Sequence, residues 1–345
     1  MKRRAIDWKR SASELAAALP PARLHPAVLA WVEQSPQRAT WAVAFSGGAD
    51  SLALLLVLWA HWPTRRARLR VLHFNHRLRG RESDGDEKFC AQVCAALDVK
   101  FIRGVWTRAR RGASEAEARA ARMAFFEQQA RVLWLGHQQD DIAESMLMRL
   151  ARGSGTAGLA APRPVQARPR GRVHLRPLLT VKKSEIAAAL RAAGVAWRED
   201  ASNARGDFFR NRVRRDVLAA WTAAAQRDAL GGAALARELL EEDDSALEAW
   251  LAALRPMAAD GSLALGKLQG KPRALVRRAL HRWLLAQPQA GELARQGFEA
   301  LLAAVERGSP TRHSLGRDGF AVIRGGVLRF ERAGKRRRRF QRRAN

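Results

Sequence analysis

Tyrosine is absent from the 345 residues of this chain, and cysteine occurs only at Cys90 and Cys94. Two thiols one helical turn apart exclude a disulfide framework and indicate a reducing compartment. No apolar run reaches the ~20 residues that a membrane span requires, and the basic start lacks the hydrophobic segment of a secretory signal. We therefore expect a cytoplasmic protein of bacterial type that has no membrane anchor.

Acidic residues are scarce as well, since 33 Asp and Glu stand against 62 Lys and Arg and give a formal charge of +29. Such an excess says little about the fold but favours a polyanionic partner, with nucleic acid first and an anionic membrane surface second. Arginine outnumbers lysine, which suits bidentate contacts to phosphate. The basic run at 335–339 predicts a tail that is disordered when free.

Strand-like and helix-like segments alternate from residue 40 onward. Apolar runs typical of buried strands lie at 40–45, 69–74, 99–105 and 131–136. Helical patterns lie at about 11–19, 26–34, 52–60, 83–97, 113–130, 138–151 and 181–193. This alternation predicts an α/β fold, a parallel twisted sheet with helices on both faces, in which a ligand binds at the carboxyl ends of the strands.

The composition changes near residue 220. Residues 217–305 are rich in Ala, Leu and Glu with helical spacing, and the strand-like stretch at 320–331 contains a Gly325-Gly326 pair typical of a hairpin turn. We therefore divide the chain into four parts. These are N-terminal leader helices at 1–38, a catalytic α/β domain at 39–218, a mainly helical domain with a small hairpin at 219–332, and a basic tail at 333–345.

A glycine-rich turn, Ser46-Gly47-Gly48-Ala49-Asp50-Ser51, joins the first apolar strand to an apolar helix. Glycines let the backbone approach an anion closely, and a helix start presents unpaired N–H groups to it. The serine hydroxyls add donors, and Asp50 can hold a magnesium ion that bridges phosphates. The G-x-x-x-x-G-K-[ST] pattern is absent, which excludes a Walker P-loop. The alternative interpretation is an ordinary strand-to-helix turn with an N-cap.

Three carboxylates, Asp140, Asp141 and Glu144, follow the strand expected at 131–136 and share one face of the next helix. In so basic a chain, an acidic cluster beside a phosphate site favours a cationic ligand, either magnesium or an ammonium group. The alternative is capping of the helix N-terminus by acidic side chains.

Two groups of arginines also accompany these motifs. Arg119 and Arg122, three residues apart on a helix, can hold a triphosphate and stabilise charge during adenylyl transfer, or they form a solvated face. The basic run at 210–215, preceded by the polar stretch at 199–203, suits an RNA backbone.

Residues 153–158 match the dinucleotide fingerprint G-x-G-x-x-G, but they follow a helical pattern instead of a strand, and positions 171–180 offer no acidic residue. We therefore expect a mobile loop, flanked by Arg149 and Arg152, that can close over a substrate.

The hexapeptide at 46–51 is similar to the signature of the PP-loop, or N-type, ATP pyrophosphatases. An ordered series of motifs over about residues 40–218 resembles the tRNA(Ile)-lysidine synthetase family: S-G-G-A-D-S, V-L-H-F-N-H-R-L-R, A-R-A-A-R, G-H-Q-Q-D-D-I-A-E-S-M-L-M-R-L-A-R-G-S-G, R-P-L-L, and E-D-A-S-N with R-N-R-V-R. The resemblance implies an enzyme that uses ATP and Mg²⁺ to adenylate the 2-carbonyl of the wobble cytidine in isoleucine tRNA with a CAU anticodon. The side-chain amine of free lysine then displaces AMP.

The resemblance also implies roles for individual residues. It assigns the turn, Ser46, Gly47, Gly48, Ala49, Asp50 and Ser51, to ATP phosphates and, through Asp50, to magnesium. It assigns Asp141 and Glu144 to the lysine ammonium, with Asp141 a candidate to accept its proton. It assigns Arg119 and Arg122 to the nucleotide. The implied tRNA contacts are Arg152, Arg210, Asn211 and Arg214.

The chain departs from the family in two respects. Met123 stands where an aromatic residue usually follows the second arginine, and the carboxy-terminal half resembles the family only loosely. The sequence does not determine whether the chain forms a homodimer.

Two rival functions remain open. A tRNA-thiolating PP-loop enzyme would need reactive cysteines, whereas we expect Cys90 and Cys94 to lie on a helix away from the motifs, and two thiols cannot complete a four-cysteine cluster. Zinc held by these cysteines with His73 and His76 is disfavoured by their spacing over different elements. The second rival is a basic RNA-binding protein whose nucleotide site is vestigial.

Overall fold

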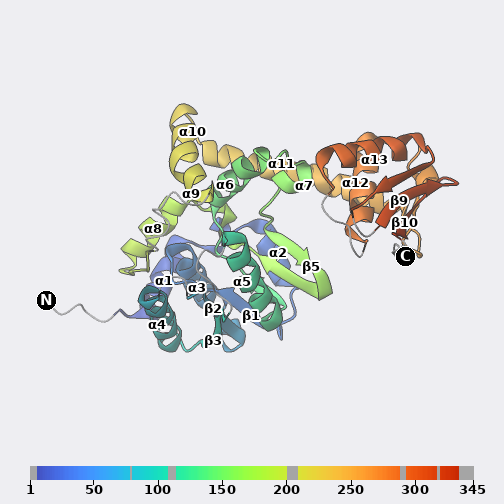
Figure 1. Cartoon of the computed structure of the whole chain (residues 1–345). Coiled ribbons are helices and arrows are strands. Elements are labelled where there is room, and N and C mark those ends of the chain that lie inside the picture. The colour runs from blue at the N-terminus through green and yellow to red at the C-terminus, as the bar shows by residue number, and fades with distance from the viewer. Residues whose placement is uncertain are drawn as a thin grey trace, which may run out of the picture. The chain divides into compact units, whose positions relative to one another are not determined.

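The computed structural model describes residues 6–77, 80–107, 114–199, 209–287, 293–316 and 319–333. The chain divides into two compact units, Met1–Glu241 and Glu242–Asn345 (Figure 1). The boundary falls inside the long helix α11 (Ala229–Leu254), whereas the composition shift placed the domain boundary at residue 218. Among the described residues, no helix combines the length and apolarity needed to cross a membrane.

The first unit contains a six-stranded sheet of order β3-β2-β1-β4-β6-β5, as the sequence pattern predicted in outline. Neighbouring strands are parallel except for the β5–β6 pair, which is antiparallel at the edge. The sequence analysis missed this edge pair because each strand is only four residues long and carries no apolar run. The strands are β1 (Trp41–Ala44), β2 (Leu69–Asn75), β3 (Lys100–Val105), β4 (Val132–Trp134), β5 (Val165–Arg168) and β6 (Arg172–Leu175).

Helices cover both faces of this sheet, which confirms the predicted layers (Figure 1). The larger core lies on the face covered by α3, whose leucines are buried all round, and the smaller core lies under α5. The helices of this unit are α1 (Trp8–Ala18), α2 (Pro26–Gln34), α3 (Ala49–His61), α4 (Arg81–Ala96), α5 (Glu115–Gln129), α6 (Gln139–Leu150), α7 (Thr156–Leu159), α8 (Lys183–Ala192), α9 (Phe209–Arg212), a π-helical segment (Val213–Leu218) and α10 (Ala219–Ala224).

The two helices that the sequence set apart as a leader lie within the first unit. Ala12 and Leu15 of α1 are buried in the same core as Leu54 of α3 and Trp41 of β1. Residues 153–158 follow α6 and run into α7, so a helix precedes the glycines and the dinucleotide fingerprint is excluded. Arg149 Nη1 donates to the Gly158 carbonyl at 2.5 Å and ties this loop to α6.

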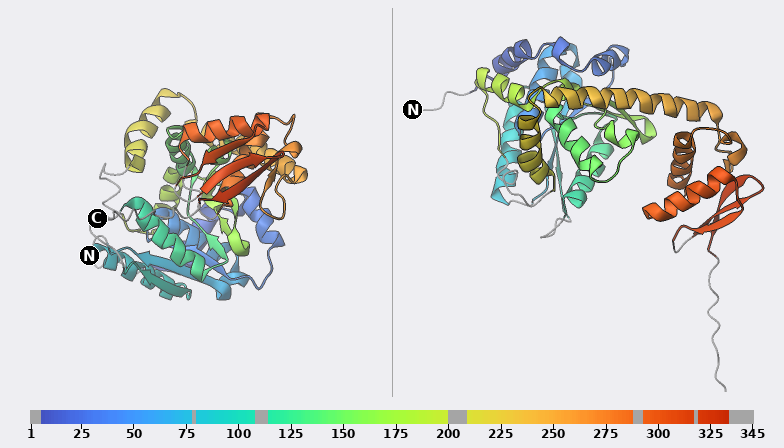
Figure 2. Two further views of the ribbon diagram at one scale, coloured as in Figure 1. Left: turned by 45° about the vertical axis from the view of Figure 1, so that its right-hand side comes forward. Right: turned by 90° about the horizontal axis from the view of Figure 1, so that it is seen from above.

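The second unit packs helices against a four-stranded antiparallel sheet of order β7-β10-β9-β8. Gly325 and Gly326 have φ values of 56° and 71° and form the two-residue turn between β9 and β10, as predicted. The elements are the carboxy-terminal part of α11, seen as one long helix in Figure 2, β7 (Leu263–Ala264), α12 (Arg273–Leu285), α13 (Arg295–Arg307), β8 (Thr311–Ser314), β9 (Gly319–Arg324) and β10 (Val327–Arg332). The basic run at 335–339 lies outside the described residues.

Candidate active site

The glycine-rich turn follows β1 at the carboxyl edge of the sheet, where the strand order places β1 between β2 and β4. Gly47 has a φ of 91°, which favours glycine, and α3 starts at Ala49 with Gly48 as its N-cap. No side chain caps this helix, so the ordinary N-cap interpretation does not hold. Ser51 Oγ instead braces the turn, accepting from the Ser46 N–H at 3.2 Å and donating to the Gly48 carbonyl at 3.0 Å.

Asp50 lies in the first turn of α3 and carries a buried oxygen, Oδ1, that has no hydrogen-bond partner among the described residues. Burial, together with the negative charge of Asp141, raises the pKa of this carboxyl to about 6. A buried carboxylate oxygen without a partner fits a divalent cation. Among the described residues, no group of three or more His, Cys, Asp or Glu side chains could hold a metal. Phosphate oxygens would therefore have to complete a magnesium site at Asp50.

Gly136 brings the end of β4 against the start of α3. A Cβ at this position would lie 2.9 Å from the Asp50 carbonyl oxygen and 3.1 Å from the Ser51 nitrogen. The two motifs that the sequence singled out, at 46–51 and 136–144, therefore meet at one edge of the sheet, as expected for parallel neighbours.

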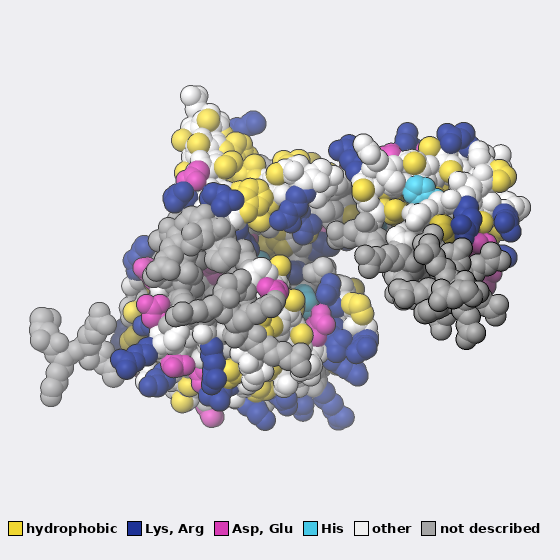
Figure 3. All heavy atoms as spheres, in the orientation of Figure 1, with side chains coloured by type: hydrophobic (Ala, Val, Ile, Leu, Met, Phe, Trp, Pro, Cys, Tyr) yellow, Lys and Arg dark blue, Asp and Glu magenta, His cyan; other side chains and the backbone are white. Residues whose placement is uncertain are grey.

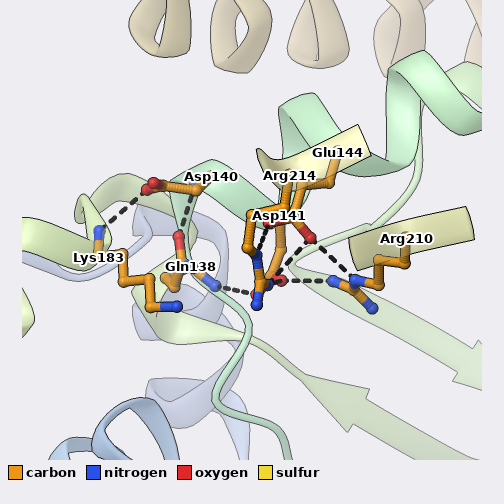
Figure 4. Close-up of polar contacts among 7 residues, drawn as sticks. All are labelled: Gln138, Asp140, Asp141, Glu144, Lys183, Arg210 and Arg214. Atoms are coloured by element: carbon orange, nitrogen blue, oxygen red, sulfur yellow. Dashed lines mark hydrogen bonds and ion pairs between the residues drawn. The ribbon is translucent and has the colours of Figure 1, made fainter. Parts of the chain in front are cut away.

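The start of α6 is held by a capping box. Gln138 is the N-cap, and Asp141 Oδ2 accepts from the Gln138 N–H at 3.0 Å. Asp140 Oδ2 accepts from the Lys183 N–H at 3.0 Å, at the start of α8 (Figure 4). Capping therefore accounts for Asp140 and for one oxygen of Asp141, and it leaves Asp141 Oδ1 and Glu144 available for other partners.

Two arginines converge on these remaining oxygens (Figure 4). Arg210 donates from Nη2 to Asp141 Oδ1 at 2.5 Å and from Nε to Glu144 Oε2 at 2.8 Å. Arg214 donates from Nε to Glu144 Oε1 at 2.5 Å and from Nη2 to Oε2 at 3.1 Å. Glu144 is only 1% exposed, so its charge depends on these partners. We call Asp141 and Glu144 the acidic pair.

The sequence predicted a cation for the acidic pair but did not identify these arginines as its partners, because 66 or more positions separate the charges. The one available signal was that Arg210 and Arg214 are four residues apart, which puts both on one helical face.

The other predicted residues lie around this site. Arg119 is exposed and Arg122 half-buried on α5, and the positive charges of both lower the pKa of His137, after burial as the main cause. Arg152 is exposed just after α6, and Asn211 is half-buried on α9. Of the polar stretch at 199–203, only Glu199 lies within the described residues.

Arg176 is a functional candidate that the sequence reasoning left without a role. It is buried at the end of β6 and donates to the Arg163 carbonyl at 2.7 Å and to Gln166 Oε1 at 3.0 Å. Burial, together with the charge of Arg119, lowers the pKa of Arg176 to about 10. Its motif, R-P-L-L, was visible in the sequence, but the burial was not.

The expected position of the cysteines was wrong for Cys90. Its Sγ lies 3.3 Å from where a Cβ of Gly47 would be, because α4 follows β2, the neighbour of β1, and packs beneath the turn. Cys90 and Cys94 are buried, and burial raises the pKa of both thiols, that of Cys94 to about 12. Such thiols are inert. His73 is buried and shares a hydrogen bond with the Phe45 carbonyl at 2.9 Å.

Comparisons with known proteins agree with this geometry. The family described as "PP-loop domain" matches residues 24–221. A tRNA(Ile)-lysidine synthase from Geobacter sulfurreducens is 38% identical over 273 residues, which are 74% of this chain and 56% of that protein. One from Pseudomonas syringae pv. tomato is 38% identical over 309 residues, covering 84% and 67%.

The chain spans about half the length of several of these relatives, as the shares of 56%, 44% and 40% show. A solved structure, the U34-tRNA thiolase NcsA from Methanococcus maripaludis with its 4Fe-4S cluster, is similar with a TM-score of 0.50 and 16% identity. That likeness covers 68% of this chain and 78% of the thiolase, and it supports the fold alone.

Replacing Gly136 by Ala tests the contact between β4 and α3. The added Cβ would meet backbone atoms of Asp50 and Ser51, so we expect the affinity for magnesium–ATP to fall about tenfold or more. Binding of a fluorescent ATP analogue measures this. Gly266→Ala is the control, since open space surrounds that glycine. Equal affinity in the two variants would contradict the geometry.

The raised pKa of Asp50 predicts a pH dependence. Below about pH 6 the carboxyl is neutral and loses its attraction for a cation, so magnesium-dependent ATP binding should weaken as the pH falls through 6. The measurement is ATP affinity against pH in the original chain and in Asp50→Asn. Protonation of ATP itself is common to both, so an identical slope in the two proteins would refute the role of Asp50.

Proposed function

This chain belongs to the tRNA(Ile)-lysidine synthase family of PP-loop proteins, and from this premise we propose that it ligates free lysine to a tRNA. The lysine joins the 2-position of the wobble cytidine of isoleucine tRNA with a CAU anticodon, and AMP and pyrophosphate are released. The observation that carries the proposal is the meeting of a glycine-rich turn, the partnerless Asp50 oxygen and the acidic pair at one edge of the sheet.

In the first step, the turn at 46–51 binds the phosphates of ATP through the N–H groups of Gly48 and the start of α3. A magnesium ion on Asp50 would neutralise phosphate charge. The cytidine carbonyl oxygen attacks the α-phosphate in line, the bond to the β-phosphate oxygen breaks, and pyrophosphate leaves. Arg119 and Arg122 on α5 stabilise the charge that develops on the phosphates.

In the second step, lysine binds on the acidic side of the site. Its side-chain amine attacks C2 of the adenylated cytidine, and AMP leaves with the electrons of the broken C–O bond. The amine must first lose a proton, which Asp141 accepts in this proposal. Because Arg210 and Arg214 already occupy the acidic pair, a lysine ammonium must compete with them for the same oxygens.

The partner in this proposal is a tRNA, and the charge of the surface supports it. On the face seen in Figure 3, basic side chains far outnumber acidic ones. Arg152, Arg210, Asn211 and Arg214 are the proposed tRNA contacts. We also propose a cytoplasmic location and a homodimer, in which the exposed Leu235 and Leu239 of α11 would be covered.

The environment of the two cysteines argues against the thiolating alternative. A persulfide or a cluster ligand needs a thiolate, and the two described thiols are buried with raised pKa values. The non-catalytic alternative leaves unexplained why Asp50 keeps a buried oxygen without a partner beside the turn.

The decisive experiment is incorporation of radiolabelled lysine into bulk tRNA in the presence of ATP. We expect label that resists mild alkali, which removes lysine held by an ester. The variant Asp50→Ala should keep tRNA binding and lose at least about 100-fold in rate, because it removes the metal-holding carboxylate. The double variant Cys90→Ala with Cys94→Ala should retain the activity. A normal rate in Asp50→Ala would refute the proposed turn chemistry, and tRNA binding without any product would favour the non-catalytic alternative.

Arg214→Gln tests the competition at the acidic pair. Removing one guanidinium leaves Arg210 alone against the two carboxylates of the acidic pair, so lysine should bind about tenfold more tightly in the absence of tRNA, equivalent to about 1.4 kcal/mol. Equilibrium dialysis with labelled lysine and a non-hydrolysable ATP analogue measures this.

Arg215→Gln is the matched control for that variant, because Arg215 pairs with Asp216 instead of the acidic pair. Glu144→Gln should weaken lysine binding. If Arg214→Gln bound lysine less tightly than the original chain, Arg214 would belong to the lysine site itself.

A further inference from the structure

The segment after α8 lies against the glycine-rich turn. The Arg198 N–H donates to the Gly47 carbonyl at 3.0 Å, and the Arg198 carbonyl would lie 3.9 Å from a Cβ at Gly48. A Cβ at Gly47 would come within 3.3 Å of Arg198 Cγ. The glycine is therefore needed at 47 for two reasons, its φ of 91° and the side chain that packs over it.

The side chain of Arg198 ties the turn to α4. Its Nε donates to Asp86 Oδ1 at 2.7 Å, and the Asp86 side chain is 12% exposed. The guanidinium lies over the first turns of α4, because a Cβ at Gly85 would be in ordinary contact with Arg198 Nη2 at 3.4 Å. Phe89 and Cys90, one helical turn further along α4, contact Gly47 from the same direction.

The segment that carries Arg198 is itself fixed by packing. Val195 is buried in the main core, and Trp197 packs against that core. The backbone just before Arg198 is therefore set by apolar contacts, and the ion pair with Asp86 holds Arg198 itself. Because the Arg198 side chain is 44% exposed, this ion pair contributes little to the stability of the fold. The effect of this ion pair is instead to fix Arg198 against the glycine-rich turn.

From these contacts we propose that Arg198 is a positioning residue for the nucleotide site. In this proposal the Arg198 side chain, anchored on Asp86, holds the Arg198 backbone N–H over the turn, so that the Gly47 carbonyl which accepts from it stays turned away from the phosphate position. The N–H groups at the start of α3 then stay directed toward the phosphates. The carbonyl dipole would otherwise repel a triphosphate. The inference rests on the proposed function, because it takes ATP as the ligand of the turn. It adds a residue outside the hexapeptide that sets the affinity for that ligand.

The test uses the full chain and compares Arg198→Ala with Arg103→Ala. Arg103 makes a similar ion pair with α4, from Nη1 to Glu87 Oε1 at 2.9 Å, so both variants lose one positive charge and one ion pair with the same helix. We expect Arg198→Ala to raise the Kd and KM for magnesium–ATP about tenfold, with kcat and the KM for lysine within about twofold of the original values. Arg103→Ala should leave the Kd for ATP unchanged, and thermal melting should be similar for both.

Two further variants separate positioning from charge. Asp86→Asn removes the anchor of the guanidinium and should weaken ATP binding as Arg198→Ala does, while the double variant should be no worse than either one. Arg198→Lys should restore part of the affinity.

An equal Kd for ATP in Arg198→Ala and Arg103→Ala would overturn the inference. An original chain that does not bind ATP would overturn it too. An original chain that binds ATP but transfers no lysine would refute the proposed reaction, and the ATP measurements would still decide the role of Arg198.

Discussion

The site depends on the close approach of two backbones, the end of β4 and the first turn of α3. Gly136 permits it, since any side chain there would press on the carbonyl of Asp50. Parallel pairing of β1 with β4 brings the two segments to the same edge, and the missing side chain lets them touch. This contact brings the buried Asp50 carboxyl close to Asp141 of the acidic pair. The negative charge of Asp141 is one cause of the raised pKa of Asp50.

Most carboxylates of the site already have partners within the fold, and one has an oxygen left for a ligand. Asp140 and one oxygen of Asp141 hold the starts of α8 and α6, and Glu144 is neutralised by two guanidiniums. The carboxylate left with a partnerless buried oxygen is that of Asp50, among the described residues. In a chain of charge +29, a cation therefore meets no competitor at the Asp50 oxygen, whereas at the acidic pair it must displace the chain's own arginines.

A similar fold does not by itself indicate that this chain carries an iron–sulfur cluster. The likeness to a tRNA thiolase with a 4Fe-4S cluster covers 68% of this chain and supports the fold alone, while the two cysteines here are buried with raised pKa values. In this chain Cys90 packs beneath the turn as a small apolar residue. The second unit has its own core and its own antiparallel sheet, so it is an independent structural body.

The residue pattern alone predicted the parallel sheet, its strands β1 to β4, the hairpin at Gly325-Gly326 and the two site motifs, because periodicity and glycine are local signals. It did not reveal the β5–β6 edge, the place of α1 in the main core, the position of Cys90, or the pairing of Arg210 and Arg214 with the acidic pair. Each of these joins residues that lie far apart in the chain. Burial and the distance between charges arise only when the chain is packed. The packed chain therefore determines that the acidic pair holds two arginines and that, among the described carboxylates, Asp50 keeps a buried oxygen without a partner.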